Sequence, residues 1–192
     1  ENARLITAAE AALAAAVKHV QAHLHSPLRE IGRVIANAAA QHNAQSIHNL
    51  SGHSIELYEI HAGITLPNYD NANEKTLGEG IYAIEPFTTS GIGSVRDGKP
   101  SGIYALVKES TVRDTLARQL LAFIHENFKT LPFCSRWLVK QFGTRALLSL
   151  KRLEDARILH HYPQLIEQSK HAVAQAEHTI VVTEKEVMVT TA

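Results

Sequence analysis

The spacing of the apolar residues changes twice along the chain, and this change limits the fold more than any other feature of the sequence. Apolar residues first recur at steps of three and four over residues 5–24 and again over residues 28–38, which predicts two amphipathic helices. Between them, Ser26 suits an N-cap and Pro27 suits the first position of the second helix. Two helices with one apolar face each need another layer to cover, which we expect to be a sheet.

Short β-rich runs follow these helices and are separated by glycine, asparagine and proline. They cover residues 47–57, 60–66, 80–87 and 102–107. Helical spacing returns over residues 111–162 as a block between strands, which indicates an insertion. The chain closes with two alternating runs around Glu184-Lys185, a predicted hairpin. This order predicts an α+β fold with an antiparallel sheet.

The composition excludes several classes of protein. With 45% apolar and 20% charged residues, a chain of 192 residues can fill one globular core. Its 19 lysines and arginines balance 19 aspartates and glutamates, so we expect no nucleic-acid partner. No run of about eighteen apolar residues is present, so we expect no membrane span. The single cysteine, Cys134, excludes an internal disulfide and fits a reducing compartment, which predicts a cytoplasmic protein.

Four side chains on the predicted strands are candidate metal ligands. His53 and His61 lie in NLSGHSIELYEIHAG. Glu85 follows apolar residues in GIYAIEPF, and Glu177 opens an apolar strand in AQAEHTIVV. A carboxylate in such a run is costly to bury unless a cation meets it, and imidazole is a common metal ligand. Side chains of these two types on neighbouring strands can converge on one ion, and they suit manganese, iron, cobalt or zinc.

Each candidate also has an ordinary structural explanation. Glu85 would be an edge-strand glutamate facing water, and Glu177 a charge at the start of a strand. Either of the two histidines alone would be a satisfied core group. The pair His160-His161 is expected on a loop, and Cys134 is expected to be buried without a base near it. From the residue pattern alone, the metal site and these explanations both stay open.

Five motifs occur in the order NLSGHSI, IHAGITLPN, EGIYAIEPF, TLPFCSRWL and AQAEHTIVV. In sequence and order they closely resemble the motifs of type II methionine aminopeptidases, and the likeness runs from Glu1 to the end of the chain. The resemblance implies the "pita-bread" fold, in which two related αβ halves enclose a two-metal site. It also implies a catalytic domain of residues 1–95 and 163–192, and an inserted, mainly helical type II subdomain of residues 96–162. The short polar loops resemble the compact archaeal form.

The resemblance assigns three of the candidates to two divalent metal ions of the cobalt, manganese, iron or zinc type. His53 corresponds to the histidine ligand, Glu85 to a carboxylate ligand that also moves protons, and Glu177 to the carboxylate that bridges both ions. In such a site the ions lower the pKa of a shared water, which attacks the scissile carbonyl. Glu85 would take the proton of that water and pass it to the leaving amine.

The same resemblance assigns four residues to the substrate, which is the N-terminal methionine of a nascent protein. His61 corresponds to the catalytic histidine that hydrogen-bonds the substrate peptide. Ile60, Phe87 and Tyr162 fall where the family builds the apolar pocket for the methionine side chain. The expected activity is the hydrolytic removal of that methionine.

The site of this family also needs two aspartates and a further histidine, which lie upstream of the helix with which this chain opens. The aspartates present here fall in predicted loops or in the helical block, and none replaces them: Asp70, Asp97, Asp114 and Asp155. The chain also starts at Glu1, without a methionine. We therefore expect the C-terminal portion of such an enzyme, and we expect its upstream segment, separate or removed, as a partner.

Two alternatives keep the same fold. A non-catalytic pita-bread module for binding or chaperoning would have lost metal ligands, whereas His53, Glu85 and Glu177 are all of the ligating type. A proline-specific peptidase would not be expected to carry TLPFCSRWL and the helical insertion. A plain α+β structural domain that happens to be rich in histidine would not account for five motifs in order.

Overall fold

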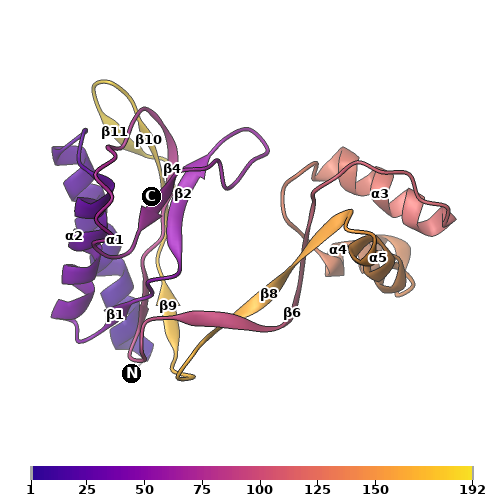
Figure 1. Cartoon of the computed structure of the whole chain (residues 1–192), viewed down its shortest axis with the longest axis horizontal. Helices are drawn as coiled ribbons and strands as arrows, with labels where there is room; N and C mark the ends of the chain where they lie inside the picture. The colour runs from indigo at the N-terminus through magenta and orange to yellow at the C-terminus, as the bar shows by residue number, and fades with distance from the viewer. Residues whose placement is uncertain (1, 192) are drawn as a thin grey trace. The chain divides into compact units, whose positions relative to one another are not determined.

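The computed structural model describes residues 2–191, so residues 1 and 192, which end the predicted catalytic domain, lie outside the described part. The chain forms two compact units (Figure 1). The first contains the residues up to Arg96 and those from Ile166 onward, and the second contains Asp97–Leu165. The catalytic role predicted for the first part of the chain and the type II role predicted for the second stay predictions.

Two helices begin the first unit, as the apolar spacing predicts. They are α1 (Asn2–Ala22) and α2 (Leu28–Gln41), which lie side by side (Figure 1). Half of the buried residues of α1 are alanines, whose small side chains allow a neighbouring backbone to approach closely. Its buried residues are Leu5, Ala8, Ala9, Ala12, Leu13, Ala16, Val17 and Val20. On α2, Gly32 makes room for a loop, because a Cβ there would lie 2.1 Å from the carbonyl oxygen of Tyr69.

The start of α2 differs from the prediction. The residue before the helix is Pro27, and no side chain caps the helix, so Ser26 is not its N-cap. The amide of Leu28 instead donates to the carbonyl oxygen of Lys75, 2.9 Å away in a neighbouring loop. Backbone oxygens already satisfy the first amides of the helix, so the hydroxyl of Ser26 is not needed as a cap. It contacts Nε2 of His19 at 2.7 Å instead.

A five-stranded sheet forms the second layer of this unit, in the order β11-β10-β4-β2-β3, and all neighbouring strands are antiparallel. Its strands are β2 (Ser51–Ile55), β3 (Thr65–Pro67), β4 (Gly80–Ile84), β10 (His178–Val182) and β11 (Val187–Val189). The antiparallel sheet and the closing β10–β11 hairpin confirm two predictions. A smaller antiparallel sheet has the order β1-β5-β9. It consists of β1 (Gln45–Ser46), β5 (Phe87–Thr89) and β9 (Val173–Gln175).

Helices α1 and α2 cover one face of the five-stranded sheet (Figure 1). Tyr82, Ile84 and Ile180 point from that face into the core that the helices close. Because successive side chains of a strand point to opposite faces, Ile81 and Ala83 belong to the other face. Ile81 is 42% exposed, so this second face is uncovered there.

Two of the predicted strands are interrupted. Residues 80–87 form two strands, β4 and β5, because Pro86 has no N–H group with which to continue the ladder. Residues 47–57 contain a turn in front of β2. In this turn Asn49 bonds the backbone of Val95, donating to its carbonyl oxygen at 2.7 Å and accepting from its amide at 2.8 Å.

A third predicted strand, residues 60–66, is mostly a turn, and only its last two residues belong to β3. Tyr58 and Gly63 have φ angles of +62° and +94°, which an extended strand does not accommodate. His61, predicted among strand residues, therefore lies in the connection between β2 and β3.

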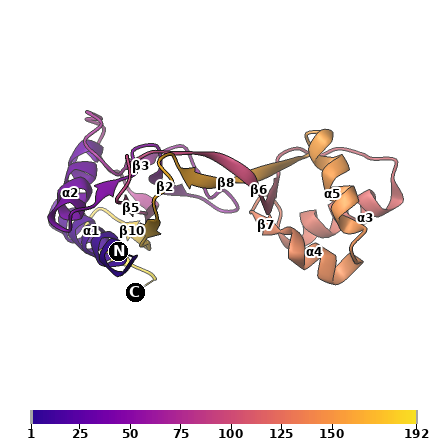
Figure 2. The ribbon, with the colours of Figure 1, turned by 90° about the horizontal axis from the view of Figure 1, so that it is seen from below.

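The second unit is not entirely helical, which corrects the predicted helical block. Its helices α3 (Thr115–Asn127), α4 (Ser135–Phe142) and α5 (Ala146–Asp155) gather around one apolar core (Figure 2). A three-stranded sheet of order β7-β6-β8 accompanies them. Its strands are β6 (Val95–Leu106), β7 (Phe133–Cys134) and β8 (Leu159–Glu167).

Three predictions fall in this sheet. His160 and His161 lie in β8 and not on a loop, because the ring of His161 stacks on Tyr104 of β6 with centroids 4.0 Å apart. Asp97 also lies in a strand, β6. Cys134 is buried, as predicted.

Within residues 2–191, none of the helices is long and apolar enough to cross a membrane.

Glu167 is a buried carboxylate that the sequence pattern did not single out; its residue is only 2% exposed. It accepts hydrogen bonds from the amide of Ile92 at 2.8 Å, from Oγ of Ser169 at 2.6 Å and from the amide of His171 at 3.2 Å. Gly91 leaves the space for it, because a Cβ there would lie 2.4 Å from the carboxyl carbon. Burial alone would raise the pKa of Glu167, but these hydrogen bonds outweigh burial and lower it.

We expect Glu167→Gln to lower the melting temperature at neutral pH by several degrees, because an amide cannot accept all of these bonds. The folded pKa of Glu167 lies below the unfolded one, so its stabilising effect is present above the unfolded pKa and is lost as the pH falls through the folded value. Melting curves followed by circular dichroism from about pH 7 to about pH 3 should therefore converge for wild type and variant. A difference that does not change with pH, or an equal loss in the exposed control Glu184→Gln, would contradict this assignment.

Candidate metal centre

His53, Glu85 and Glu177 come from neighbouring strands and share the sheet face that is turned away from α1 and α2. In β2, His53 lies opposite Ala83 of β4, and on the other side of β4 Thr179 of β10 lies opposite the same residue. Glu85 follows Ala83 by two residues, and Glu177 precedes Thr179 by two. Because residues two apart point to the same face, the register places the three predicted ligands on one face near the end of β4.

Polar contacts join these side chains. Nε2 of His53 lies 2.9 Å from Oε1 of Glu85, and the two side chains are only 15% and 13% exposed. Nε2 of Gln175, at the end of β9, donates to Oε2 of Glu85 at 2.9 Å and to Oε2 of Glu177 at 3.3 Å. One amide nitrogen thus bridges two carboxylates that would otherwise repel each other.

The other oxygen of Glu85 has unused capacity for a ligand. Oε1 is buried and makes no hydrogen bond within the described residues, and Nε2 of His53 lies 2.9 Å from it. A buried carboxylate with an orphaned oxygen is unfavourable by itself. An imidazole nitrogen and a free carboxylate oxygen at this separation are a donor pair that suits one divalent cation. His53 and Glu85 therefore fit the metal that the resemblance implies.

The described residues supply only part of a metal site. Within residues 2–191, no group of three or more histidine, cysteine, aspartate and glutamate side chains is arranged to hold an ion. Aspartates elsewhere have other partners: Asp70 pairs with Arg29 at 2.9 Å, and Asp114 pairs with Arg152 at 2.6 Å while capping α3. These carboxylates do not replace the two aspartates of the family.

The electrostatics of the site favour proton transfer. Burial, and secondly the charge of Glu177, raises the pKa of Glu85 to about 7. A carboxyl group that titrates near neutral pH can both accept and release a proton. Partial burial, and secondly the nearby His53, lowers the pKa of His61. His61 is therefore neutral at pH 7, with one ring nitrogen as a donor and the other as an acceptor.

The structure brings two of the predicted substrate residues close to these ligands. The ring of His61 packs edge-on against that of His53, with centroids 4.4 Å apart. Phe87 is half-buried and lies opposite Gln175 in the β5–β9 pair, so it neighbours the bridging amide. Ile60, also half-buried, directly precedes His61. Their contacts with a methionine side chain stay a prediction.

Tyr162 belongs to the second unit, where its ring lies edge-on to that of His160 with the centroids 4.5 Å apart. Its place in a methionine pocket stays a prediction.

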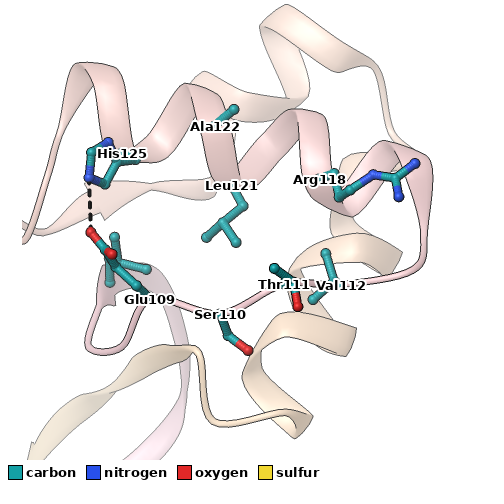
Figure 3. Close-up of a pocket in the computed structure, with 9 residues that line it drawn as sticks. Glu109, Ser110, Thr111, Val112, Arg118, Leu121, Ala122 and His125 are labelled. Atoms are coloured by element: carbon teal, nitrogen blue, oxygen red, sulfur yellow. Dashed lines mark ion pairs between the residues drawn. The ribbon is translucent and has the colours of Figure 1, made fainter.

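The second unit has a separate cleft of about 520 Å³ beside α3 (Figure 3). Glu109 and His125 form an exposed ion pair at its rim, 3.2 Å apart, and Leu121 lines it. The residues that line this cleft include none of the predicted site residues.

Two residues that hold the site were missed in the sequence. Gln175 stands two positions before Glu177, so strand alternation places it on the same face and could have identified it. Asn68 is fully buried and donates from Nδ2 to the carbonyl oxygens of Leu50, at 3.1 Å, and of Glu85, at 3.0 Å. It ties the segment before β2 to the end of β4, and no local pattern indicates such a bridge.

We expect Asn68→Ala to lower the free energy of unfolding by about 2–4 kcal/mol, because two carbonyl oxygens lose their buried donor. Asn68→Asp should be at least as harmful, since a carboxylate has no hydrogen to donate. Urea denaturation followed by fluorescence measures both. The exposed Asn71→Ala is the control and should change stability by no more than about 0.5 kcal/mol. An Asn68→Ala protein that unfolds at the wild-type urea concentration would show that the bridge does not hold Glu85.

Comparisons with known sequences agree with the family that the motifs resemble. A profile of metallopeptidase family M24 matches residues 1–184. Methionine aminopeptidase of Pyrococcus abyssi is 42% identical to the chain over 194 residues, and that of Methanocaldococcus jannaschii is 38% identical over 188 residues. These alignments cover 100% and 97% of this chain but only 65% and 63% of the relatives. The chain thus spans less than two thirds of the length of these curated archaeal relatives.

Solved structures share the fold at low sequence identity. A thermophilic Arx1 superposes with a TM-score of 0.75 at 13% identity, over 97% of this chain and 56% of that chain. Methionine aminopeptidase from Rickettsia prowazekii gives a TM-score of 0.56 at 19% identity, over 98% of this chain and 51% of that chain. These likenesses concern the fold alone, and they confirm the predicted α+β fold of the pita-bread type.

Proposed function

The chain belongs to metallopeptidase family M24, and we propose that it is the C-terminal portion of a type II methionine aminopeptidase, which removes the N-terminal methionine from nascent proteins. One observation carries the proposal: His53 and Glu85 are largely shielded from solvent, and Nε2 of the one lies 2.9 Å from Oε1 of the other without a hydrogen bond between them. The archaeal methionine aminopeptidases that are 38% and 42% identical to the chain support the reaction. The motif TLPFCSRWL supports type II.

Each residue of the pair has a role toward the metal. Two divalent ions, of cobalt, manganese, iron or zinc, would supply the Lewis acidity that lowers the pKa of an attacking water. His53 would bind through Nε2, Glu85 through Oε1, and Glu177 would be the carboxylate shared by both ions. Gln175 fixes the second oxygen of each carboxylate, so the ligating oxygens are oriented in advance.

The same residues and their neighbours would handle the proton and the peptide. Glu85 would take a proton from the attacking water and deliver it to the leaving amine. His61, neutral at pH 7, would hydrogen-bond the substrate peptide. Ile60, Phe87 and Tyr162 would line the apolar pocket for the methionine side chain.

We infer that the remaining ligands come from a segment upstream of this sequence. The curated relatives are longer than this chain, and the described residues hold only part of a metal site. The sheet face that carries His53 and Glu85 is uncovered at Ile81 and would lie against that segment. The proposed partners are therefore this segment and nascent peptides that begin with methionine, and the proposed location is the cytoplasm.

The test is the release of methionine from a Met-Ala peptide with added manganese or cobalt. This chain is compared with a longer polypeptide that carries the upstream segment of its natural gene. We expect activity in the longer polypeptide and little in this chain. A longer polypeptide that folds but releases no methionine would reject the proposal. Release of the first residue from an Xaa-Pro peptide alone would point to a proline-specific peptidase instead.

A non-catalytic binding module of the same fold is the second candidate. One observation favours it, which is that residues 2–191 contain no complete group of metal ligands. Against it stand His53 and Glu85, whose Nε2 and Oε1 lie 2.9 Å apart without a hydrogen bond within the described residues, an arrangement that suits a cation. An inactive but folded longer polypeptide would favour this candidate.

A further inference from the structure

We propose that the end of α1 carries a separate binding site for a transition-metal ion of the zinc, nickel or copper class, with His19 and His23 as its ligands. The two residues are four positions apart, a spacing that places side chains on one face of a helix. The amide of His23 bonds the carbonyl oxygen of His19 at 3.0 Å, so the helical spacing continues just past the end of α1. The two ring centroids are 4.9 Å apart, close enough for one ion to contact a nitrogen of each ring.

Ser26 orients the first ligand. Its Oγ lies 2.7 Å from Nε2 of His19 and donates weakly to the carbonyl oxygen of Pro27 at 3.4 Å. The proposed site requires the tautomer in which this hydroxyl accepts from Nε2–H, which leaves Nδ1 of His19 with a free lone pair. Metal-binding histidines commonly use one ring nitrogen in this way to fix the other as the ligand. Ser26 is only 6% exposed, so its position is well constrained.

The charges around the site allow a cation. Burial lowers the pKa of His19, and His23 and Arg33 lower it further, while Glu30 raises it. The net effect keeps His19 neutral at pH 7, as a ligand must be. The positive charge of Arg33 is compensated, because its Nε donates to Oε2 of Glu30 at 2.9 Å. His25 is the remaining titratable group that lines the cleft.

The cleft leaves room for the water that would complete the coordination shell. It has a volume of about 630 Å³ and is lined by both histidines. No group of three or more ligating side chains is assembled within residues 2–191. The site therefore has two protein ligands and is open to solvent, unlike a closed structural zinc site with four ligands. Imidazole pairs of this kind suit zinc, copper and nickel better than magnesium or calcium.

Calorimetric titration of the chain with zinc chloride and nickel chloride tests the site. We expect one ion per chain in this cleft, a loss of affinity of about tenfold or more in His23→Ala, and a similar loss in Ser26→Ala through misorientation of His19. His23 is exposed, so its replacement should not disturb folding. Zinc should also raise the melting temperature of the wild type more than that of His23→Ala.

Two controls separate this site from other histidines. His25→Ala removes a histidine of the same cleft that the proposal does not use, and it should leave the affinity within about twofold. The titrations are repeated in a His53→Ala background, so that binding at the candidate metal centre does not contribute. Unchanged zinc affinity in His23→Ala, or an equal loss in His25→Ala, would overturn the proposal.

Discussion

Replacement of Glu85 by glutamine is expected to abolish methionine release by the longer polypeptide, with a fall in kcat of about a thousandfold or more. Glutamine keeps the size of the side chain and can still contact Gln175. It cannot take up a proton, and it is a poor metal ligand. Steady-state release of methionine from Met-Ala with manganese or cobalt measures the effect.

The matched control for this substitution is Glu79→Gln. Glu79 is an exposed glutamate directly before β4, on the same segment but away from the carboxylate pair. Its replacement removes the same charge and should leave kcat within about twofold. Retained turnover in Glu85→Gln, with full metal content, would refute the proton transfer assigned to Glu85. A metal affinity reduced in Glu85→Gln would support its role as a ligand independently of the rate.

Replacement of Gly52 by alanine is expected to lower the free energy of unfolding by about 3 kcal/mol or more. Gly52 lies in β2 directly before His53, where β2 and β4 approach closely. A Cβ there would lie 2.2 Å from the carbonyl oxygen of Ala83, a backbone atom that cannot move without breaking the ladder. The strands would separate, so His53 would also move away from Glu85 and zinc or manganese binding there should weaken.

Urea denaturation and a metal titration measure the two consequences for Gly52→Ala. The control is Gly78→Ala, because a Cβ at Gly78 meets no atom within 4 Å. Stability of that variant should stay within about 0.5 kcal/mol of wild type. A Gly52→Ala protein as stable as Gly78→Ala would mean that β2 and β4 do not need this close approach.

The predictions from the sequence were wrong where a contact between distant segments, and not the local residue pattern, decides the structure. Ser26 has the residue type of an N-cap, but the backbone at Lys75 satisfies the start of α2, and this loop is 47 residues away in the sequence. His160 and His161 resemble loop residues because they precede a Tyr-Pro pair. The stacking of His161 on Tyr104 instead holds them in a strand.

At the candidate site, too, local residue types could be recognised in the sequence, whereas the contacts between distant segments could not. Residue type made His53, Glu85 and Glu177 candidate ligands, and the motif order predicted their roles, which stay predictions. Their juxtaposition depends on the register of three strands that are distant in sequence. Alternation relative to Glu177 could have singled out Gln175, but its double hydrogen bond to the two carboxylates is not visible in the order of residues.

The sequence by itself determined the α+β class, the two covering helices and the closing hairpin. These features follow from the spacing of apolar residues, which recurs every three to four positions in helices and every two in strands. Only the tertiary structure decided which face of the sheet stays uncovered and how closely β2 approaches β4. It also decided which oxygen of Glu85 is left without a hydrogen bond. Such features arise from contacts between segments far apart along the chain, and the free energy of those contacts depends on distances that no local pattern contains.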